Sequence, residues 1–134
     1  MTIGEMFSCK FIEGKELYPL QKWYNSLLAK TPDDIDVADV LHMFRQKMFM
    51  EFAVEKALDM LQENIFIGEL WPGELLEKIS MLDAGMFHNQ KSKLEYIKKK
   101  GTSELKDYTC SFFEDDIQDI KNSLARIHSI LEII

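Results

Sequence analysis

The chain has 134 residues, a length typical of one domain, and its 46% hydrophobic content is enough to form a globular core. It carries 23 acidic and 16 basic residues, a formal net charge of -7, and only Arg45 and Arg126 are arginines. Because phosphate binding needs a surplus of lysine and arginine, this balance argues against a general nucleic-acid binder. The excess of acid suits a basic partner or serves solubility, and the composition leaves both interpretations open.

The two cysteines, Cys9 and Cys110, form neither a disulfide framework nor a metal-ligand pattern, which indicates a reducing compartment. The first residues do not have the basic and then apolar segments of a signal peptide. The apolar runs are also too short to span a membrane. We therefore expect a soluble, cytoplasmic protein that does not interact with a membrane.

Apolar residues recur at helical spacing from Glu16 onward, which predicts a mainly α fold. The first helix is expected to end before Thr31. The second starts at Asp36, a helix-capping residue that has Asp39 three positions later. A third apolar stripe runs over residues 50–61.

Two further helices are predicted in the second half of the chain. Pro72 and Glu74 fall in the first turn of one of them. A weaker helix runs from near His88 to Lys100, where a run of lysines followed by Gly101 is a normal stop signal.

The last helix has the clearest pattern. Ser111 and Glu114 have the spacing of a capping box, and apolar residues follow in alternating steps of four and three from Phe113 to Ile134. Such a stripe is typical of the central helix of a monomeric bundle, and a coiled-coil dimer is the alternative.

Polar and apolar residues alternate near the N-terminus, so residues 1–15 are expected to form a short extended arm. Thr109-Cys110 is the segment that could pair with it. Residues 16–134 are expected to form a compact bundle of about five to six helices, and residues 1–134 a single domain.

No group of residues has the spacing of a catalytic or metal site. His42, His88 and His128 have no partner at metal-ligand or triad spacing, and no glycine-rich loop follows a strand. We therefore expect no catalytic residues, no metal and no cofactor, and a small enzyme is a minor alternative.

Charge is unevenly distributed along the chain. Residues 1–90 carry a net charge of -7, residues 91–100 carry +4, and residues 101–134 carry -4. The Lys91–Lys100 stretch has one aromatic residue, Tyr96, and no arginine, so a solvated helix face is favoured over an RNA-binding helix.

Residues 25–80 resemble the immunity proteins of bacterial contact-dependent growth inhibition (CDI) systems. The resemblance rests on three segments: Leu28-Ala-Lys-Thr-Pro-Asp-Asp-Ile-Asp-Val-Ala-Asp-Val-Leu41, Ala57-Leu-Asp-Met-Leu-Gln-Glu-Asn64 and Gly68-Glu-Leu-Trp-Pro-Gly-Glu-Leu-Leu76. The helix start Asp-Val-x-Asp and the segment Gly-x-x-x-Pro-Gly-acid-Leu-Leu are its most specific parts.

The resemblance implies a cytosolic, bacterial protein that binds the C-terminal toxin domain of a cognate effector and catalyses nothing. It implies a basic toxin, a nuclease such as an RNase or tRNase, whose active site or substrate groove is blocked in a 1:1 complex. The immunity protein would not contact nucleic acid directly. The matched motif is expected to be structural, with Gly68 in a tight connection, Pro72 and Glu74 at a helix start, and Leu75 and Leu76 in the core.

Exposed acidic residues are the expected contacts to a basic toxin, because complementary charge speeds association. The candidates are Asp33, Asp34, Asp36, Asp39, Glu69, Glu74, Glu114, Asp115, Asp116 and Asp119. The alternative function is a homodimeric helical scaffold or adaptor, assembled through the Phe113–Ile134 stripe.

Overall fold

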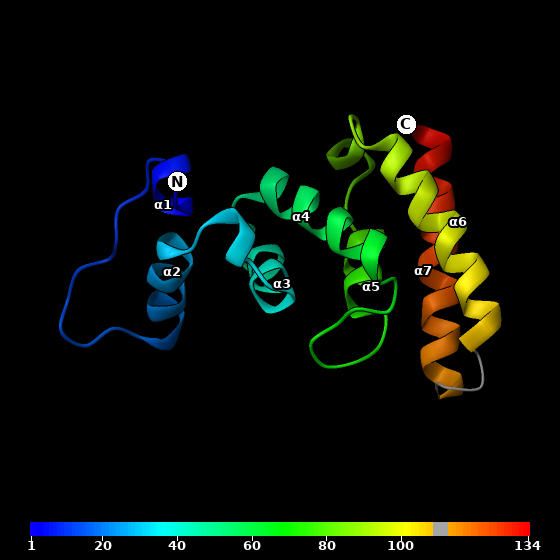
Figure 1. Cartoon of the computed structure of the whole chain (residues 1–134), viewed down its shortest axis with the longest axis horizontal. Helices are drawn as coiled ribbons and strands as arrows, with labels where there is room; N and C mark the ends of the chain where they lie inside the picture. The colour runs from blue at the N-terminus through cyan, green and yellow to red at the C-terminus, as the bar shows by residue number, and fades with distance from the viewer. Residues whose placement is uncertain (109–112) are drawn as a thin grey trace.

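The computed structural model describes residues 1–108 and 113–134, and these residues form helices and no β-strand (Figure 1). The predicted mainly α class is confirmed. The α-helices are α1 (Ile3–Met6), α2 (Pro19–Ala29), α3 (Val37–Gln46), α4 (Met50–Glu63), α5 (Glu74–Ser80), α6 (Lys91–Tyr108) and α7 (Glu114–Ile133). Two short 3₁₀ turns, η1 (Pro32–Asp34) and η2 (Ala84–Phe87), connect them.

The helices are arranged across the molecule roughly in chain order. In Figure 1, α1 and α2 lie at one end, α3, α4 and α5 in the middle, and α6 beside α7 at the other end. Helix α4 packs against α3, α5 and α6, while α7 packs against α5 and α6. Contacts with α4 and α7 therefore hold α3, α5 and α6 together.

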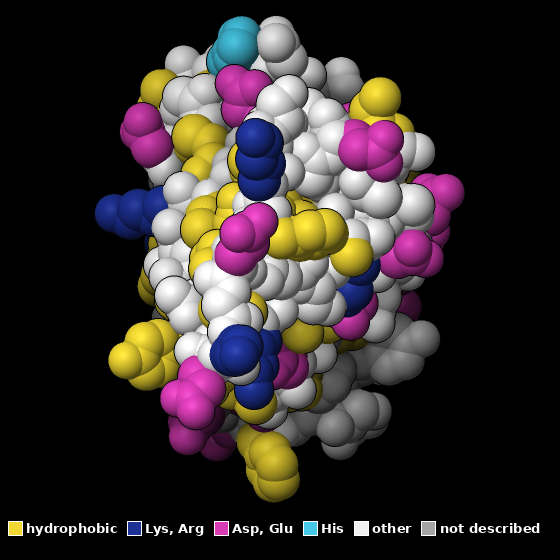
Figure 2. All heavy atoms as spheres, turned by 90° about the vertical axis from the view of Figure 1, so that its left-hand side faces the viewer, with side chains coloured by type: hydrophobic (Ala, Val, Ile, Leu, Met, Phe, Trp, Pro, Cys, Tyr) yellow, Lys and Arg dark blue, Asp and Glu magenta, His cyan; other side chains and the backbone are white. Residues whose placement is uncertain are grey.

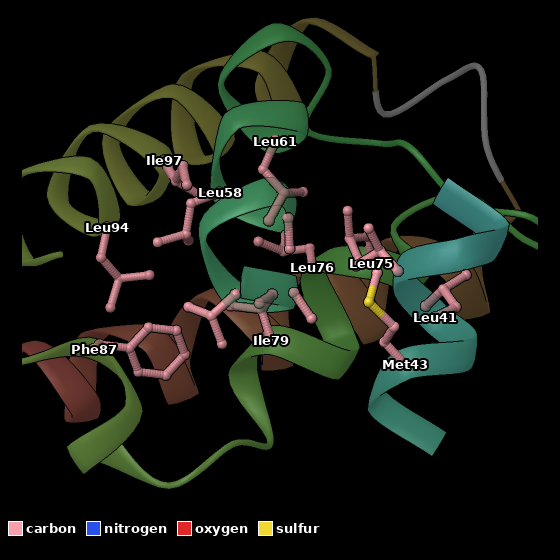
Figure 3. Packing of buried hydrophobic residues seen from close by; sticks show 14 of the residues in the cluster. Leu41, Met43, Leu58, Leu61, Leu75, Leu76, Ile79, Phe87, Leu94 and Ile97 are labelled. Carbon is pink, nitrogen blue, oxygen red and sulfur yellow. The ribbon is translucent and has the colours of Figure 1, made fainter. Parts of the chain in front are cut away.

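The core is built from the apolar stripes that the sequence predicts. Figure 3 shows α4, α5, α6 and η2 directing leucine, isoleucine and phenylalanine side chains toward one another. Leu58 and Leu61 of α4 and Leu75 and Leu76 of α5 have no solvent-exposed surface. At about 25 cal/mol per Å² of buried apolar area, this burial is the main stabilising contribution to the fold.

The long apolar stripe of the last helix is also part of this core. Ile120, Leu124 and Ile127 of α7 are buried, and α7 lies against α5 and α6 of the same chain. Most of the Phe113–Ile134 stripe, on which the alternative homodimer depends, therefore packs within the chain.

The N-terminal segment differs from the predicted arm in its first turn. Residues 3–6 form a helix whose N-terminus is capped by a capping box between Thr2 and Glu5, and Ile3 is fully buried. The Ile3 N–H donates to the Lys30 carbonyl at 2.8 Å, which fixes α1 to the end of α2. Residues 9–18 contain no helix, and the Asn25 side chain hydrogen-bonds both backbone groups of Ile12 at 2.7 and 2.9 Å.

The predicted stop at Lys100-Gly101 is wrong, because α6 continues to Tyr108. Gly101 is buried against α7, and a Cβ atom there would lie 2.8 Å from Leu124 Cδ2. The glycine is therefore a close-packing position in the middle of a helix, where the contact with α7 outweighs its poor helix propensity.

The helix starts agree with the sequence in one case and differ in another. Asp36 caps α3 as predicted, since the Asp39 N–H donates to Asp36 Oδ1 at 2.9 Å. Pro72, in contrast, lies before α5 rather than in its first turn; Gly73 is the N-cap, with φ +79°, and Glu74 is the first helical residue. For α7 the N-cap is Phe113, while Ser111 and the Thr109-Cys110 segment lie outside the described residues.

Candidate functional site

The sequence predicts two acidic clusters, and the fold keeps them apart. The first acidic cluster (Asp33, Asp34, Asp36 and Asp39) lies at η1 and the start of α3, and the second acidic cluster (Glu114, Asp115, Asp116 and Asp119) at the start of α7. Figure 1 shows these two helix starts in different parts of the molecule. The clusters therefore do not combine into one acidic surface.

Asp39 is buried, contrary to the exposure expected of it. Its residue surface is 4% exposed, and its carboxylate accepts hydrogen bonds from Lys30 Nζ at 2.6 Å and from Trp23 Nε1 at 3.3 Å. Burial by itself would raise the pKa of Asp39, but the hydrogen bonds from Lys30 and from the Asp36 backbone outweigh it and lower the pKa. The hydrogen bond to Asp39 in turn raises the pKa of Lys30. Asp39 therefore joins α2 to α3 and has no exposed face for a partner.

The other three members of the first acidic cluster are exposed. Asp34 accepts a hydrogen bond from Thr31 Oγ1 at 2.9 Å, and Asp36 caps α3, so both also stabilise local structure. Asp33 lines a hollow of about 240 Å³ between η1 and α4, together with Asp59 and Glu63. We call Asp33, Asp59 and Glu63 the η1–α4 surface.

Asp59 and Glu63 are not among the acids that the sequence predicts as toxin contacts. They belong to a row of exposed acids that follows α4 at every fourth position, which also includes Glu51 and Glu55. Asp59 forms an exposed ion pair with Lys93 at 3.0 Å, and Lys56 lies in the same hollow, so the row is not uniformly negative. Acids at four-residue intervals within a predicted helix are the signal that could have identified this row.

Glu74 is also buried, contrary to its expected exposure. It is 1% exposed, and its Oε1 accepts hydrogen bonds from the backbone N–H groups of Glu69 at 2.7 Å and Leu70 at 2.9 Å. Gly68 allows this tight turn, because a Cβ atom there would lie 2.1 Å from the Trp71 carbonyl oxygen. Glu69 remains exposed.

These contacts explain the motif at residues 68–76 as a structural unit. Gly73 lies against Ile120, where a Cβ atom would approach Ile120 Cγ1 to 2.7 Å, and Leu75 and Leu76 are in the core. The predicted roles of Gly68, Leu75 and Leu76 are confirmed. The hydrogen bonds from the loop N–H groups to the Glu74 carboxylate are not predicted by the sequence.

The second acidic cluster lies at the surface. Glu114, Asp115 and Asp119 are exposed and Asp116 is half-buried. Among the residues that the structure describes, none of the four carboxylates lies within 4.0 Å of a lysine or arginine nitrogen. Phe113, next to the cluster, is 82% exposed, so an aromatic side chain accompanies the acids.

Exposed apolar side chains concentrate at the N-terminal end of the molecule. Figure 2 views this end and shows hydrophobic side chains gathered on it among charged groups of both signs. Seven large hydrophobic residues are exposed within residues 1–20: Met1, Met6, Phe7, Phe11, Ile12, Tyr18 and Leu20. Aromatic and apolar side chains often carry most of the affinity at protein interfaces.

This apolar end adjoins α4. The Phe7 ring stacks on Phe49 with 4.3 Å between centroids and meets Phe52 edge-on at 5.8 Å. Phe52 lies on α4 one residue after Glu51 and three before Glu55. Phe52 and Glu55, three residues apart, are therefore neighbours on the surface of α4.

The described residues show no arrangement typical of a metal site or a membrane span. In residues 1–108 and 113–134, no three histidine, cysteine, aspartate or glutamate side chains are grouped so as to hold a metal ion. No helix in this part of the chain is both long enough and apolar enough to cross a bilayer. His42 packs edge-on against Trp23 at 4.7 Å, His88 is exposed, and His128 lies between Lys98 and Glu132.

Comparison with known proteins decides the family. The family model of CDI immunity proteins matches residues 5–97, well over half of the chain. The chain belongs to the CDI immunity proteins. No curated protein and no solved structure matches it significantly.

The family match confirms the resemblance seen in the sequence and extends beyond it. It includes the Asp36–Asp39 helix start, the 68–76 motif, the α4 row and most of the apolar N-terminal end. Membership in the CDI immunity proteins indicates a protein that neutralises a toxin. The match ends within α6, so residues 98–108 of α6 and all of α7 lie outside it.

Proposed function

We propose that this CDI immunity protein acts in the bacterial cytoplasm by binding one cognate toxin domain, in a 1:1 complex, without catalysis. The toxin is a basic nuclease, an RNase or tRNase, and binding blocks its active site or substrate groove. The observation that carries the proposal is the family match over residues 5–97. The acidic surfaces and the net charge of -7 support a basic partner, since nucleases hold phosphates with lysine and arginine.

The proposed contacts divide into charged and apolar groups. The η1–α4 surface and the second acidic cluster would steer the basic toxin and raise the association rate, an effect that salt weakens. Exposed apolar residues beside α4, such as Phe7, would then slow dissociation. Of the original candidates, Asp33, Asp34, Asp36, Glu69, Glu114, Asp115, Asp116 and Asp119 remain in the proposal, whereas Asp39 and Glu74 are excluded by their burial.

Coexpression with a cognate CDI toxin domain tests the function itself. We expect the two chains to purify together in equal amounts and the cells to survive, while the toxin alone stops growth. A toxin that stays active in the presence of this protein, or that fails to purify with it, contradicts the proposal.

Charge reversal distinguishes the two acidic surfaces. One variant combines Asp33→Lys, Asp59→Lys and Glu63→Lys, and the other combines Glu114→Lys, Asp115→Lys and Asp119→Lys. Asp83→Lys is the control for an exposed acid outside both groups. At low salt we expect the variant that alters the toxin interface to slow association about tenfold or more, and the control less than about twofold. Unchanged association in both triple variants would exclude both acidic surfaces.

A further inference from the structure

Helices α6 and α7 form a groove that the proposed toxin contacts do not use. The two helices lie side by side in Figure 1. A hollow of about 650 Å³ is lined by one side of α6, from Lys91 to Lys106, and by His128 and Leu131 of α7. A second hollow of about 440 Å³ shares Thr102 and Lys106 with the first. The two hollows therefore adjoin at these residues, and we call them together the α6–α7 groove.

The groove is positively charged, although the protein as a whole is acidic. Its lining contains two glutamates, Glu95 and Glu132, and five lysines: Lys91, Lys98, Lys99, Lys106 and Lys121. The other two lysines of the Lys-rich segment point elsewhere: Lys93 pairs with Asp59, and Lys100 donates to the Gln62 carbonyl. Two lysines of the Lys91–Lys100 stretch therefore contact α4, and the other three line the groove.

Most of the groove lysines are not neutralised within the chain. Lys98 Nζ lies 2.5 Å from His128 Nδ1, and His128 Nε2 lies 2.9 Å from Glu132. In the described part of the chain, no carboxylate lies within 4.0 Å of the ammonium groups of Lys99, Lys106 or Lys121. These ammonium groups are available to acidic groups of a partner.

The floor of the groove is apolar. Leu105 of α6 and Leu124 of α7, which are 5% and 8% exposed, and the half-buried Leu131 of α7 line it between the lysines. Two packed helices with an apolar seam and charged rims offer the surface on which a third amphipathic helix can lie.

The lysine spacing also fits a helical partner. Lys91, Lys98 or Lys99, and Lys106 are separated by seven or eight residues, about two helical turns and roughly 11 Å along the axis. A helix lying in the groove with acids at the same interval places one carboxylate beside each lysine. Pairs of this kind set the partner preference of helices packed side by side.

Nucleic acid fits the groove less well. The lining contains no arginine and no tyrosine, phenylalanine or tryptophan to stack on bases, and its two glutamates repel phosphates. Tyr96 lines a different hollow, with Gln62 and Lys93. The apolar floor has no counterpart in a phosphate backbone.

We propose that the α6–α7 groove binds an acidic amphipathic helix of a second protein partner, at a surface separate from the toxin contacts. This partner differs in charge from the basic toxin. The groove also lies largely in the part of the chain beyond residue 97, outside the match to the CDI immunity proteins.

Fluorescence anisotropy with a labelled model helix tests the proposal on the full chain. The probe is a three-heptad peptide with leucine on one face and glutamate at the flanking positions. Comparison probes replace glutamate with lysine, replace leucine with serine, or substitute a single-stranded RNA of similar charge. We expect the acidic leucine peptide to bind in the groove. The lysine peptide is expected to bind only the acidic surfaces, so its affinity should not fall when groove charges are reversed.

A matched pair of variants locates the binding site. Lys99→Glu with Lys106→Glu reverses two groove charges, while Lys15→Glu with Lys22→Glu reverses two exposed lysines outside the groove. We expect the groove variant to lose at least about tenfold in peptide affinity and the control to lose less than about twofold. Circular dichroism checks that both variants are folded.

Several results would overturn the proposal. Equal losses in both variants would mean non-specific attraction, and unchanged affinity in the groove variant or no peptide binding would exclude the site. Stronger binding of the RNA, lost in the groove variant, would favour the nucleic-acid alternative. Toxin neutralisation is measured with the same variants, and its loss in the groove variant would show that the surfaces are not separate.

Discussion

The two acidic clusters have similar compositions and different structural roles. Each brings four acids within seven residues at the start of a helix. In the first acidic cluster, Asp39 is buried. It accepts hydrogen bonds from Trp23 of α2 and from Lys30, the residue that follows α2. In the second acidic cluster no carboxylate is buried and none has an ion-pair partner among the described residues.

This difference shows how the surroundings decide what an acid does. Trp23 and Lys30 lie 16 and 9 residues before Asp39, and they turn a helix-start residue into part of the polar interior. A buried, paired carboxylate is expected to contribute to folding, whereas exposed carboxylates contribute to association with a basic partner.

The largest effect is expected for Asp39→Ala. The substitution leaves Trp23 Nε1 and the Asp36 N–H without their acceptor and Lys30 without its partner, so we expect a loss of about 3 kcal/mol in unfolding free energy. Urea unfolding measures it. Asp119→Ala in the second acidic cluster is the control, with an expected change within about 0.5 kcal/mol. A loss below about 1 kcal/mol for Asp39→Ala would remove the distinction between the clusters.

Glu74→Ala tests the same distinction at a second buried acid. Two loop N–H groups lose their acceptor, so we expect a loss of about 2 kcal/mol in the same urea experiment. Glu69→Ala removes an exposed acid from the same loop and is expected to change stability by no more than about 0.5 kcal/mol. Similar losses in the two variants would mean that burial of the carboxylate does not determine its role.

The pH dependence of stability should sharpen the comparison. Because the pKa of Asp39 is lowered in the folded state, its contribution is present above its ordinary pKa of 3.8 and is lost as the pH falls below that value. We expect the stability gap between the unmodified protein and Asp39→Asn to narrow from pH 5 to pH 3, measured by thermal unfolding. A gap that is constant over this range would mean that the charge of Asp39 adds nothing to stability.

The smallest effect is expected for Glu114→Gln in the second acidic cluster. Glu114 is in the first turn of α7, where a negative charge interacts favourably with the helix dipole, so we expect a loss of about 0.3–0.5 kcal/mol. Unfolding in low and high salt measures it, because salt screens an exposed charge. A salt-independent loss above about 1.5 kcal/mol would instead indicate a buried partner.

Most of the helices could be predicted because their apolar spacing is regular. The stripes of α3, α4 and α7 enter the core as the sequence indicates, and Asp36 caps α3 as its position suggests. The end of α6 could not be predicted, because Gly101 signals a stop unless its contact with Leu124 is known. The one-turn helix α1 was missed for a similar reason, since its stability depends on burial of Ile3 beside Lys30.

The candidate site was less predictable than the fold. Charge patterns identified Asp33 correctly as exposed, but Asp39 and Glu74 are buried by contacts that sequence spacing does not reveal. The α4 row could have been found, because acids at every fourth position of a helix share one side. The apolar N-terminal end has no periodic pattern, so only the structure shows that these side chains are exposed.

The family match ends inside α6, which has a consequence for exchanging the tail of this protein with that of another member. Residues on both sides of a junction near residue 97 belong to α6. In a chimaera, the residue count before the junction therefore sets the direction in which every later side chain of α6 points. Each inserted or deleted residue rotates the downstream helix by about 100°. A slip of one residue would turn Gly101 away from Leu124 and present a bulkier side chain to α7. Functional chimaeras are therefore expected to preserve the residue count through this junction.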